Sequence, residues 1–315
     1  MSFLLIAVGL VGLLFGGEML VRGAVSLAKR LGISPLVIGL TLVGFGTSTP
    51  ELVTSIQAAL AGSPGVAVGN VVGSNIANVL LILGMAALIA PVAADPRAFR
   101  RDGGALIAAT ILGVLTILLG TIEWELGLVL ICGLVLYLAA VLMIERRDVE
   151  AGRLVEESET LTEAPGGAAV AFLFFLGGLV VTVLGARFLV TGAVDIARSF
   201  GVSEAVIGLT LVAVGTSLPE LVTSVIAARK GQADVALGNV VGSNIYNILG
   251  ILGVTALVRP LEVPPEIARF DVWVMAASTV ALVVAVVSGW RVTRTEGAML
   301  LAAYAAYIAW LVLQL

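Results

Sequence analysis

Long apolar runs, separated by short polar stretches, follow one another along the whole chain. A helix needs about 20 mostly apolar residues to cross a bilayer. The first run, Phe3 to Leu20, has no basic stretch before it and no clear small-residue cleavage site after it, so we interpret it as a span rather than a signal peptide. We therefore predict an all-α polytopic membrane protein with ten spans, at about 2–22, 35–60, 66–90, 103–121, 126–144, 168–192, 204–228, 235–258, 271–288 and 296–314.

The composition excludes most other classes of protein. Hydrophobic residues make up 60% and charged residues 12% of the 315 residues, whereas a soluble domain carries about 25% charged residues. A soluble enzyme, a nucleic-acid-binding protein and a disordered scaffold are therefore excluded. The chain has no His and a single Cys, Cys132, which also excludes internal disulfides, Cys/His metal sites and catalytic triads built on His.

The positively charged residues favour one orientation in the membrane. Of the 17 Lys and Arg residues, 13 follow an odd-numbered predicted span, and the remaining four lie on the opposite side: Arg187, Arg198, Arg259 and Arg269. Cytoplasmic loops are enriched in Lys and Arg. We therefore expect an integral protein of the cell (inner or plasma) membrane with both chain termini on the outer side. The longest connection, residues 145–167, carries several Glu residues and is expected to be a cytoplasmic linker.

The most specific signal is an internal repeat. Residues 35–84 and 204–253 align without a gap at an offset of 169 residues and share 34 identities in 50 positions. The identities include polar motifs in register, which chance similarity between apolar helices does not produce. We therefore divide the chain into a first five-span repeat at 1–144, the linker, and a second five-span repeat at 168–315.

The number of spans per repeat predicts how the two copies lie in the membrane. Five is odd, so the second copy is expected to be inverted relative to the first. Inverted repeats whose helices are interrupted by Gly and Pro at matching positions are typical of secondary transporters, with a substrate site near the bilayer midplane. A duplicated fold can also be only a scaffold, but the polar residues in these repeats favour a binding site.

Two acidic residues, Glu51 and Glu220, lie in the middle of predicted spans at equivalent positions of the repeats. An ionisable group at the bilayer centre costs about 2.5–3.5 kcal/mol even on lenient scales. No Lys or Arg lies within a helical turn of either glutamate. We infer that the compensating charge comes from outside the protein, as cations or protons. The alternative is a pair of protonated glutamates hydrogen-bonded into the core.

More oxygen-bearing residues accompany the glutamates. A Thr and a Ser lie four and three positions before each one, on the same helix face, and a Gly and a Pro bracket that turn. Because Pro removes a backbone donor, the helix is expected to break there and to free carbonyl oxygens that can face a cation. The third span of each repeat is expected to break in the same way, beside a Ser and an Asn. Such residues in membrane helices often form only helix–helix hydrogen bonds. These candidates are Thr47, Ser48, Thr216, Ser217, Ser74, Asn78, Ser243 and Asn247.

The candidate residues supply only oxygen ligands. Carboxylates, hydroxyls, amides and carbonyls suit Ca²⁺ and alkali ions rather than Zn²⁺ or Cu. Two carboxylates neutralise one Ca²⁺, and the neutral oxygens beside them can form smaller sites for Na⁺. Ca²⁺ and Na⁺ together exceed the charge that two carboxylates balance, so the two ions should compete. Competition at one site, reached alternately from each side, makes an antiporter.

The motifs GTSTPE and GSNIAN, with GTSLPE and GSNIYN in the second repeat, resemble the sodium/calcium exchangers of the cation/calcium antiporter superfamily. The resemblance covers about fifty residues per half and the ten-span inverted layout. It implies that spans 1 and 6 are long helices that slide across the core. It also implies these roles: shared Ca²⁺ and Na⁺ carboxylates at Glu51 and Glu220, Ca²⁺-binding carbonyls at Thr47 and Thr216, Na⁺ sites at Ser48, Ser217, Ser74 and Ser243, backbone oxygens at Gly44 and Ala213, and flanking amides at Asn78 and Asn247.

Two departures bear on which ions are coupled. Some members of the superfamily, including the potassium-dependent branch, carry Asp where Asn247 stands. The proton-coupled branch typically has an Asn-x-x-Glu-His pattern, and this chain has no His. The leading prediction is therefore Na⁺/Ca²⁺ antiport, with H⁺/Ca²⁺ or K⁺-dependent Na⁺/Ca²⁺ antiport as alternatives.

Other function classes fit less well. An intramembrane hydrolase at Ser48 or Ser217 lacks a His base, and the two Lys residues, Lys29 and Lys230, lie at loop positions. A channel needs a continuous pore, which broken helices around carboxylates do not favour. We therefore expect a transporter rather than an enzyme, with Ca²⁺ and Na⁺ as substrates, the lipid bilayer as its surroundings, and neither a cofactor nor a nucleic acid nor an obligatory protein partner.

Overall fold

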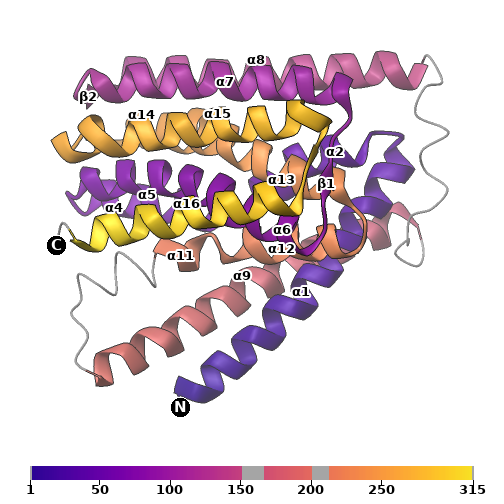
Figure 1. The fold of residues 1–315 in the computed structure, drawn as a ribbon, viewed down its shortest axis with the longest axis horizontal. Helices are drawn as coiled ribbons and strands as arrows, with labels where there is room; N and C mark the ends of the chain where they lie inside the picture. Colours follow the sequence, from indigo (N-terminus) through magenta and orange to yellow (C-terminus); the bar gives the residue numbers. More distant parts are fainter. Residues whose placement is uncertain (1, 151–166, 201–212, 314–315) are drawn as a thin grey trace.

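A computed structural model describes residues 2–150, 167–200 and 213–313, and nearly all of them are helical (Figure 1). The first half consists of α1 (Ser2–Leu31), α2 (Pro35–Ile38), the π-helical η1 (Gly39–Val43), α3 (Gly44–Thr47), α4 (Thr49–Leu60), α5 (Pro64–Ala77), the π-helical η2 (Asn78–Leu83), α6 (Gly84–Ile89), β1 (Val92–Ala93), α7 (Pro96–Leu118), β2 (Thr121–Ile122) and α8 (Trp124–Glu150). The described second half consists of α9 (Ala168–Ser199), α11 (Ala213–Thr216), α12 (Leu218–Arg229), α13 (Ala233–Ile245), the π-helical η4 (Tyr246–Ile251), α14 (Leu252–Val258), β3 (Leu261–Glu262), the π-helical η5 (Ile267–Asp271), α15 (Val272–Gly289), β4 (Arg291–Val292) and α16 (Arg294–Leu313).

The described residues contain eight helices that are long and apolar enough to cross a membrane, and the bent pair at 36–60 raises the number to nine. The predicted span at 204–228 begins among residues 201–212, which lie outside the described part of the chain. The prediction of an all-α membrane protein is confirmed, while the tenth span stays a prediction.

Two helices are longer than the apolar pattern predicts. α1 continues to Leu31 instead of ending near residue 22, and α9 continues to Ser199 instead of ending near residue 192. Arg187 lies within α9, as the predicted span at 168–192 implies. Within α1, Glu18 binds Arg22 of the same helix and Lys230 at the end of α12.

α1 and α9 form an antiparallel pair that lies along one side of the other helices, at the bottom of Figure 1. Glycines let the two backbones approach closely, as small residues do in membrane helices. A Cβ atom on Gly16 would lie 2.5 Å from the backbone nitrogen of Thr182, and one on Gly178 would lie 2.3 Å from that of Leu20. Such glycines recur every seven residues, at Gly9, Gly16, Gly23, Gly178, Gly185 and Gly192.

The two halves contact each other reciprocally. β1 pairs with β4, whereas β3, its repeat equivalent, pairs with β2. The Thr110 hydroxyl on α7 lies 3.1 Å from the hydroxyl of its own repeat equivalent, Thr279 on α15. A residue that meets its own counterpart indicates an approximate twofold axis, as in an isologous interface. This reciprocity supports the predicted inversion, whose direction in the membrane stays a prediction.

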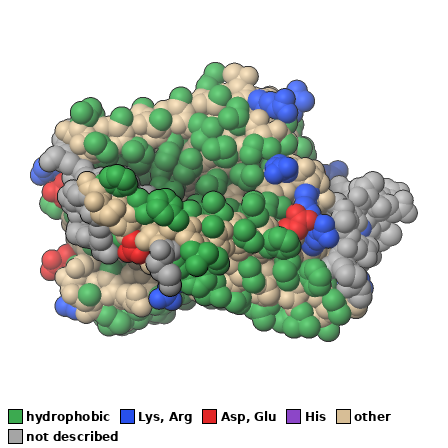
Figure 2. Space-filling model, turned by 90° about the horizontal axis from the view of Figure 1, so that it is seen from below, with side chains coloured by type: hydrophobic (Ala, Val, Ile, Leu, Met, Phe, Trp, Pro, Cys, Tyr) green, Lys and Arg blue, Asp and Glu red, His purple; other side chains and the backbone are tan. Residues whose placement is uncertain are grey.

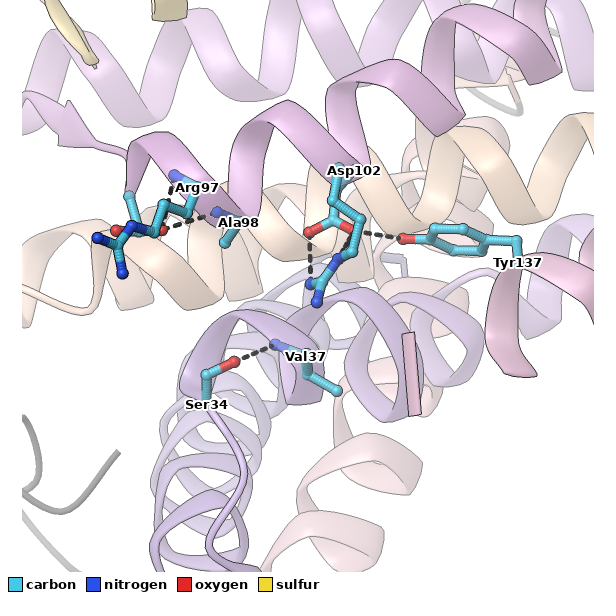
Figure 3. Close-up of polar contacts among 8 residues, drawn as sticks. Ser34, Val37, Arg97, Ala98, Asp102 and Tyr137 are labelled. Atoms are coloured by element: carbon cyan, nitrogen blue, oxygen red, sulfur yellow. Dashed lines mark hydrogen bonds and ion pairs between the residues drawn. The ribbon is translucent and has the colours of Figure 1, made fainter. Parts of the chain in front are cut away.

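Tyr–Asp hydrogen bonds join the outer helices in both halves. On α7, the buried Asp102 accepts hydrogen bonds from the Arg101 guanidinium and, at 3.3 Å, from the Tyr137 hydroxyl of α8 (Figure 3). In the second half, the Tyr307 hydroxyl of α16 donates to Asp271 over 2.9 Å. These bonds satisfy acidic side chains that lie within apolar helices, as buried polar groups require.

The molecular surface matches a bilayer. Figure 2 shows Lys, Arg, Asp and Glu side chains near the two ends of the long axis, with a mainly hydrophobic face between them. Large apolar side chains are exposed there and elsewhere, such as Phe3 (79%), Leu136 (70%) and Phe15 (68%). An apolar surface of this extent is unusual for a soluble protein and suits contact with lipid. Both chain ends lie in the left half of Figure 1.

Candidate ion-binding site

Both helices that carry a candidate glutamate break at a serine. α3 ends at Thr47 and α4 begins at Thr49, with a bend of 42° between the two segments of the pair. Ser48 has φ −81° and ψ 7°, and Ser217, between α11 and α12, has φ −91° and ψ 7°. A proline lies in the first turn of each following helix, where its missing N–H leaves no helical hydrogen bond unmade. The predicted breaks are confirmed.

The two breaks exchange hydrogen bonds between the halves. The Ser48 hydroxyl donates to Oε1 of Glu220 over 2.9 Å, and the Ser217 hydroxyl donates to Oε1 of Glu51 over 3.0 Å. Each glutamate is only 1% exposed, and Oε2 of each has no hydrogen-bond donor. No Lys or Arg of the described chain forms an ion pair with either carboxylate. Two acidic groups therefore share one buried region.

Two asparagines that the sequence interpretation missed hold the glutamate helices in place. Asn70 on α5 donates to the Glu51 carbonyl oxygen over 3.1 Å and to the Ser55 hydroxyl over 2.9 Å. Its repeat equivalent, Asn239 on α13, donates to the Glu220 carbonyl over 3.3 Å and to the Ser224 hydroxyl over 2.9 Å. The available signal was the identity of these asparagines in both repeats.

The third span of each half does not break at its asparagine. Asn78 opens η2 and Asn247 lies within η4, so both asparagines are in π-helical turns of otherwise continuous helices. This corrects the predicted second pair of breaks, and the reason is that neither segment contains a proline. The Asn78 amide donates to Oδ1 of Asn244 over 3.0 Å, while Oδ1 of Asn78 and of Asn247 have no donor.

Three predicted residues meet where α3 lies against α13. The Ser243 hydroxyl lies 3.4 Å from the carbonyl oxygen of Gly44. A Cβ atom at Gly44 would lie 3.2 Å from the backbone nitrogen of Ser243, so the glycine permits this close approach. The Thr47 hydroxyl lies 3.0 Å from the Val43 carbonyl oxygen and 3.2 Å from Oδ1 of Asn239. The hydroxyls of Ser243 and Thr47 and the Gly44 carbonyl oxygen are therefore already hydrogen-bonded within the protein.

The remaining predicted residues lie on the same elements. Ser74 is buried on α5, four residues before Asn78. Ala213 is the first residue and Thr216 the last residue of α11, the short helix before the second break. The structure therefore brings together both glutamates and the two break serines. η2 and η4, which carry Asn78 and Asn247, pack against α12 and α4, the helices of the glutamates.

Comparisons with known proteins show the family of the chain. The profile of the family described as sodium/calcium exchanger protein matches residues 1–143 and 170–313. The chain belongs to the sodium/calcium exchanger family. The family consists of membrane antiporters of cations, so the resemblance seen in the motifs is confirmed.

Relatives of this exchanger match nearly its whole length. It is 36% identical over 343 aligned positions to the sodium/calcium exchanger MaX1 of Methanosarcina acetivorans, covering 98% of this chain and 97% of that protein. It is 38% identical over 273 positions to the inner membrane protein YrbG of Escherichia coli, covering 86% of this chain and 84% of that protein. Its fold is similar to a solved structure of the sodium-calcium exchanger NCX_Mj, with a TM-score of 0.84 and 31% identity, covering 98% of this chain and 97% of that one.

A cavity of about 470 Å³ in this exchanger lies between α4, α9 and α11. We call it the α4–α9 cavity. Its lining includes Pro50, which precedes Glu51, and Thr216, which precedes Ser217. The cavity therefore reaches the residues that flank both breaks.

The repeat-equivalent place on the other side is closed. There α1 packs on α12: a Cβ atom at Gly17 would lie 2.7 Å from Cδ1 of Ile226 and 2.8 Å from Cγ1 of Val222. The equivalents of these three residues, shifted by 169, are Ala186, Gln57 and Val53, and all three line the cavity. The same positions thus touch on one side of the molecule and are separated by a cavity on the other.

Proposed function

We propose that the protein exchanges Na⁺ for Ca²⁺ across the membrane at a site built on Glu51 and Glu220. The supporting observation is the pair of buried carboxylates without a cationic side chain beside them. Four acceptor oxygens there lack a donor: Oε2 of each glutamate and Oδ1 of Asn78 and Asn247. Buried acceptors of this kind are costly unless they meet a positive partner. Oxygen ligands of this type suit Ca²⁺ and Na⁺.

Charge balance gives the proposed competition between the ions. Two carboxylates neutralise one Ca²⁺, so Na⁺ ions that fill the same region have to displace it. Three Na⁺ would leave one net positive charge and make exchange electrogenic, whereas two would not. The serines at the breaks would then serve as neutral ligands for Na⁺, together with the Asn oxygens.

The contrast between the two sides of the molecule supports alternating access. The α4–α9 cavity reaches the breaks from one side, while the equivalent α1–α12 contact is closed. The two halves share one sequence pattern. The state with access from the opposite side would therefore form if α9 closed on α4 and a cavity opened between α1 and α12. We infer that 1–144 and 168–315 act as inverted repeats, and that the α1–α9 pair moves against the other helices during the exchange.

Transport by the purified protein in liposomes tests the proposal. Vesicles loaded with Na⁺ should take up Ca²⁺, whereas vesicles loaded with choline should not. Glu51→Gln and Glu220→Gln should each lower this uptake by about a hundredfold or more, because each removes a charged ligand and half of the balancing charge. Glu125→Gln, at an exposed residue of α8, is the matched control and should transport normally.

The test separates a lost site from a lost fold. Both site variants should elute as the wild type does in size-exclusion chromatography, since neither change alters side-chain size. Near-normal exchange by either variant would contradict the proposed site. The absence of any Na⁺-driven uptake by the unmodified protein would contradict the proposed function itself.

Proton coupling is the second candidate, and one observation favours it. Each glutamate keeps one oxygen without a donor in a buried position, so two protons could neutralise the pair as Ca²⁺ does. An imposed pH gradient would then drive Ca²⁺ uptake without Na⁺. We expect a pH gradient to drive much less Ca²⁺ uptake than an equal Na⁺ gradient. The reason is that the site also offers neutral Ser and Asn oxygens, which Na⁺ can use as ligands and protons do not require.

A further inference from the structure

Arg187 is a positively charged residue of the lining of the α4–α9 cavity. It lies on α9, its side chain is exposed, and it is the single charged residue among the described residues that line the cavity. The lining residues of α4 that surround the same space, including Val53, Thr54 and Gln57, are uncharged. The described chain offers its guanidinium no hydrogen-bond acceptor or ion-pair partner.

The equivalent position on the closed side carries the opposite charge. Shifting Arg187 by 169 residues leads to Glu18 on α1. Glu18 is bound by Arg22 at 2.7 Å and by Lys230 at the end of α12, so its charge is compensated where the helices close. Among the described residues, Arg187 has no such partner. Its charge is therefore available to act on ions in the cavity.

We propose that Arg187 sets how strongly the cavity discriminates between ions by their valence, disfavouring Ca²⁺ more than Na⁺. The proposal rests on the proposed function, because it takes the cavity as the path of these ions to Glu51 and Glu220. A fixed positive charge raises the local potential, and clefts with low-dielectric walls concentrate such fields. The free energy of an ion in that potential scales with its valence. If the charge lowers the occupancy of Na⁺ in the cavity by a factor f, it therefore lowers the occupancy of Ca²⁺ by f².

Coulomb's law gives the expected size of this effect. At a separation of ~8 Å in water, one unit charge lowers the occupancy of a monovalent cation about two- to threefold, and that of a divalent cation about four- to ninefold. Dissolved salt screens the effect, because the Debye length falls from about 30 Å at 0.01 M to about 8 Å at 0.15 M ionic strength. The discrimination should therefore be largest in dilute buffer.

A charge series at this position tests the proposal in liposomes at low ionic strength. Arg187→Lys should behave as the wild type, Arg187→Gln should raise kcat/KM for Ca²⁺ about four- to ninefold, and Arg187→Glu should raise it further. The concentration of Na⁺ that gives half-maximal exchange should fall by only the square root of that factor. Both changes should shrink when 0.15 M choline chloride is added, with kcat nearly unchanged.

Arg269→Gln is the matched control. Arg269 is an exposed residue at the start of the α15 span and does not line the cavity. Removing its charge should leave both ion dependences as they are. The effect of Arg187→Gln should also be confined to the membrane face on which the cavity opens, which right-side-out and inverted vesicles distinguish.

Three outcomes would overturn the proposal. One is an unchanged kcat/KM for Ca²⁺ in Arg187→Gln, and another is an equal factor for Na⁺ and Ca²⁺. The third is a loss of kcat in Arg187→Gln and Arg187→Lys alike, which would show that the side chain matters for packing. In each case wild-type Na⁺/Ca²⁺ exchange would persist, so the proposed function would stand.

Discussion

At the scale of single residues, the side chains of Asn78 and Asn247 are neutral amides and add no fixed charge to the proposed site. Both present neutral oxygens without a donor, so the negative charge comes from Glu51 and Glu220 alone. A K⁺ ion bound beside Ca²⁺ would leave one uncompensated positive charge in a buried region. Such a charge is costly where water is excluded.

We therefore predict that Na⁺-driven Ca²⁺ uptake by the unmodified protein does not depend on K⁺. Uptake of radioactive Ca²⁺ into liposomes should be equal in K⁺ and in choline buffers. Asn247→Asp would add the missing negative charge and should either create K⁺ dependence or take up a proton and leave the rate unchanged. A requirement for K⁺ in the unmodified protein would show that the charge argument is wrong.

The sequence predicts the residues of the site that carry charge or lie beside a proline, such as Glu51 and Ser48. It does not predict Asn70, which reaches the Glu51 carbonyl from the following helix. Nor does it show that the Ser48 hydroxyl binds the glutamate of the other half, 172 residues away. Both are tertiary contacts, and helical spacing describes only neighbours on one helix.

At the scale of elements, the contact between α1 and α9 depends on glycine. We predict that Gly16→Ala destabilises the protein, because its Cβ atom would lie 2.5 Å from both the backbone nitrogen and the hydroxyl of Thr182. Overpacking of this kind costs about 1–3 kcal/mol. The melting temperature in detergent, followed by tryptophan fluorescence, should fall.

Gly104→Ala is the control for helix propensity. Gly104 lies within α7 and nothing lies within 4 Å of the position that its Cβ atom would take. Alanine in a helix is about 0.5–1 kcal/mol more favourable than glycine, so this variant should melt at the same or a higher temperature. Equal stability of the Gly16→Ala protein and the wild type would contradict the close packing of α1 on α9.

The ion pair between Glu18 and Lys230 joins α1 to the end of α12 on the closed side. We predict that Lys230→Gln shifts the protein away from the conformation with an open α4–α9 cavity. Partly exposed pairs contribute about 0.2–1 kcal/mol, which corresponds to a 1.4- to 5-fold change in population.

Labelling of a cysteine in the cavity measures this shift. Thr191→Cys, made in a Cys132→Ala background, places a thiol at a residue that lines the cavity. The labelling rate with a membrane-impermeant maleimide should fall when Lys230→Gln is added. Arg229→Gln, at the neighbouring exposed residue, should leave the rate unchanged, and a faster rate in Lys230→Gln would contradict the role of the pair.

The apolar pattern predicts the spans but not their ends or their local twist. α9 runs on past residue 192 although it contains Arg187, because a long charged side chain can reach water from within a helix. The sequence predicts breaks at Asn78 and Asn247, where the structure has π-helical turns. A π-helical turn accommodates an extra residue without ending the helix, and no residue type marks it in the sequence as clearly as proline marks a break.

At the scale of the whole molecule, the repeat predicts a twofold relation between the halves but not the difference between them. Gly17 touches Val222 and Ile226, whereas the equivalent residues line a cavity. The two copies share 34 identities in 50 positions over 35–84 and 204–253. At the three contacting positions only Val222 has an identical equivalent, Val53, while Gly17 and Ile226 are replaced by Ala186 and Gln57. One sequence pattern that allows two packings is what a transporter with two access states requires.

The orientation of the molecule is the last prediction. The 13 to 4 distribution of Lys and Arg places the 145–167 linker in the cytoplasm and the turn between β2 and α8 outside. In a Cys132→Ala background, Glu123→Cys in that turn should react with an impermeant maleimide on intact cells. Ser158→Cys in the linker should react only after the cells are permeabilised. The reverse labelling pattern would show that the molecule has the opposite orientation in the membrane. Labelling of both sites from outside would show that the number of spans in the first repeat is not five.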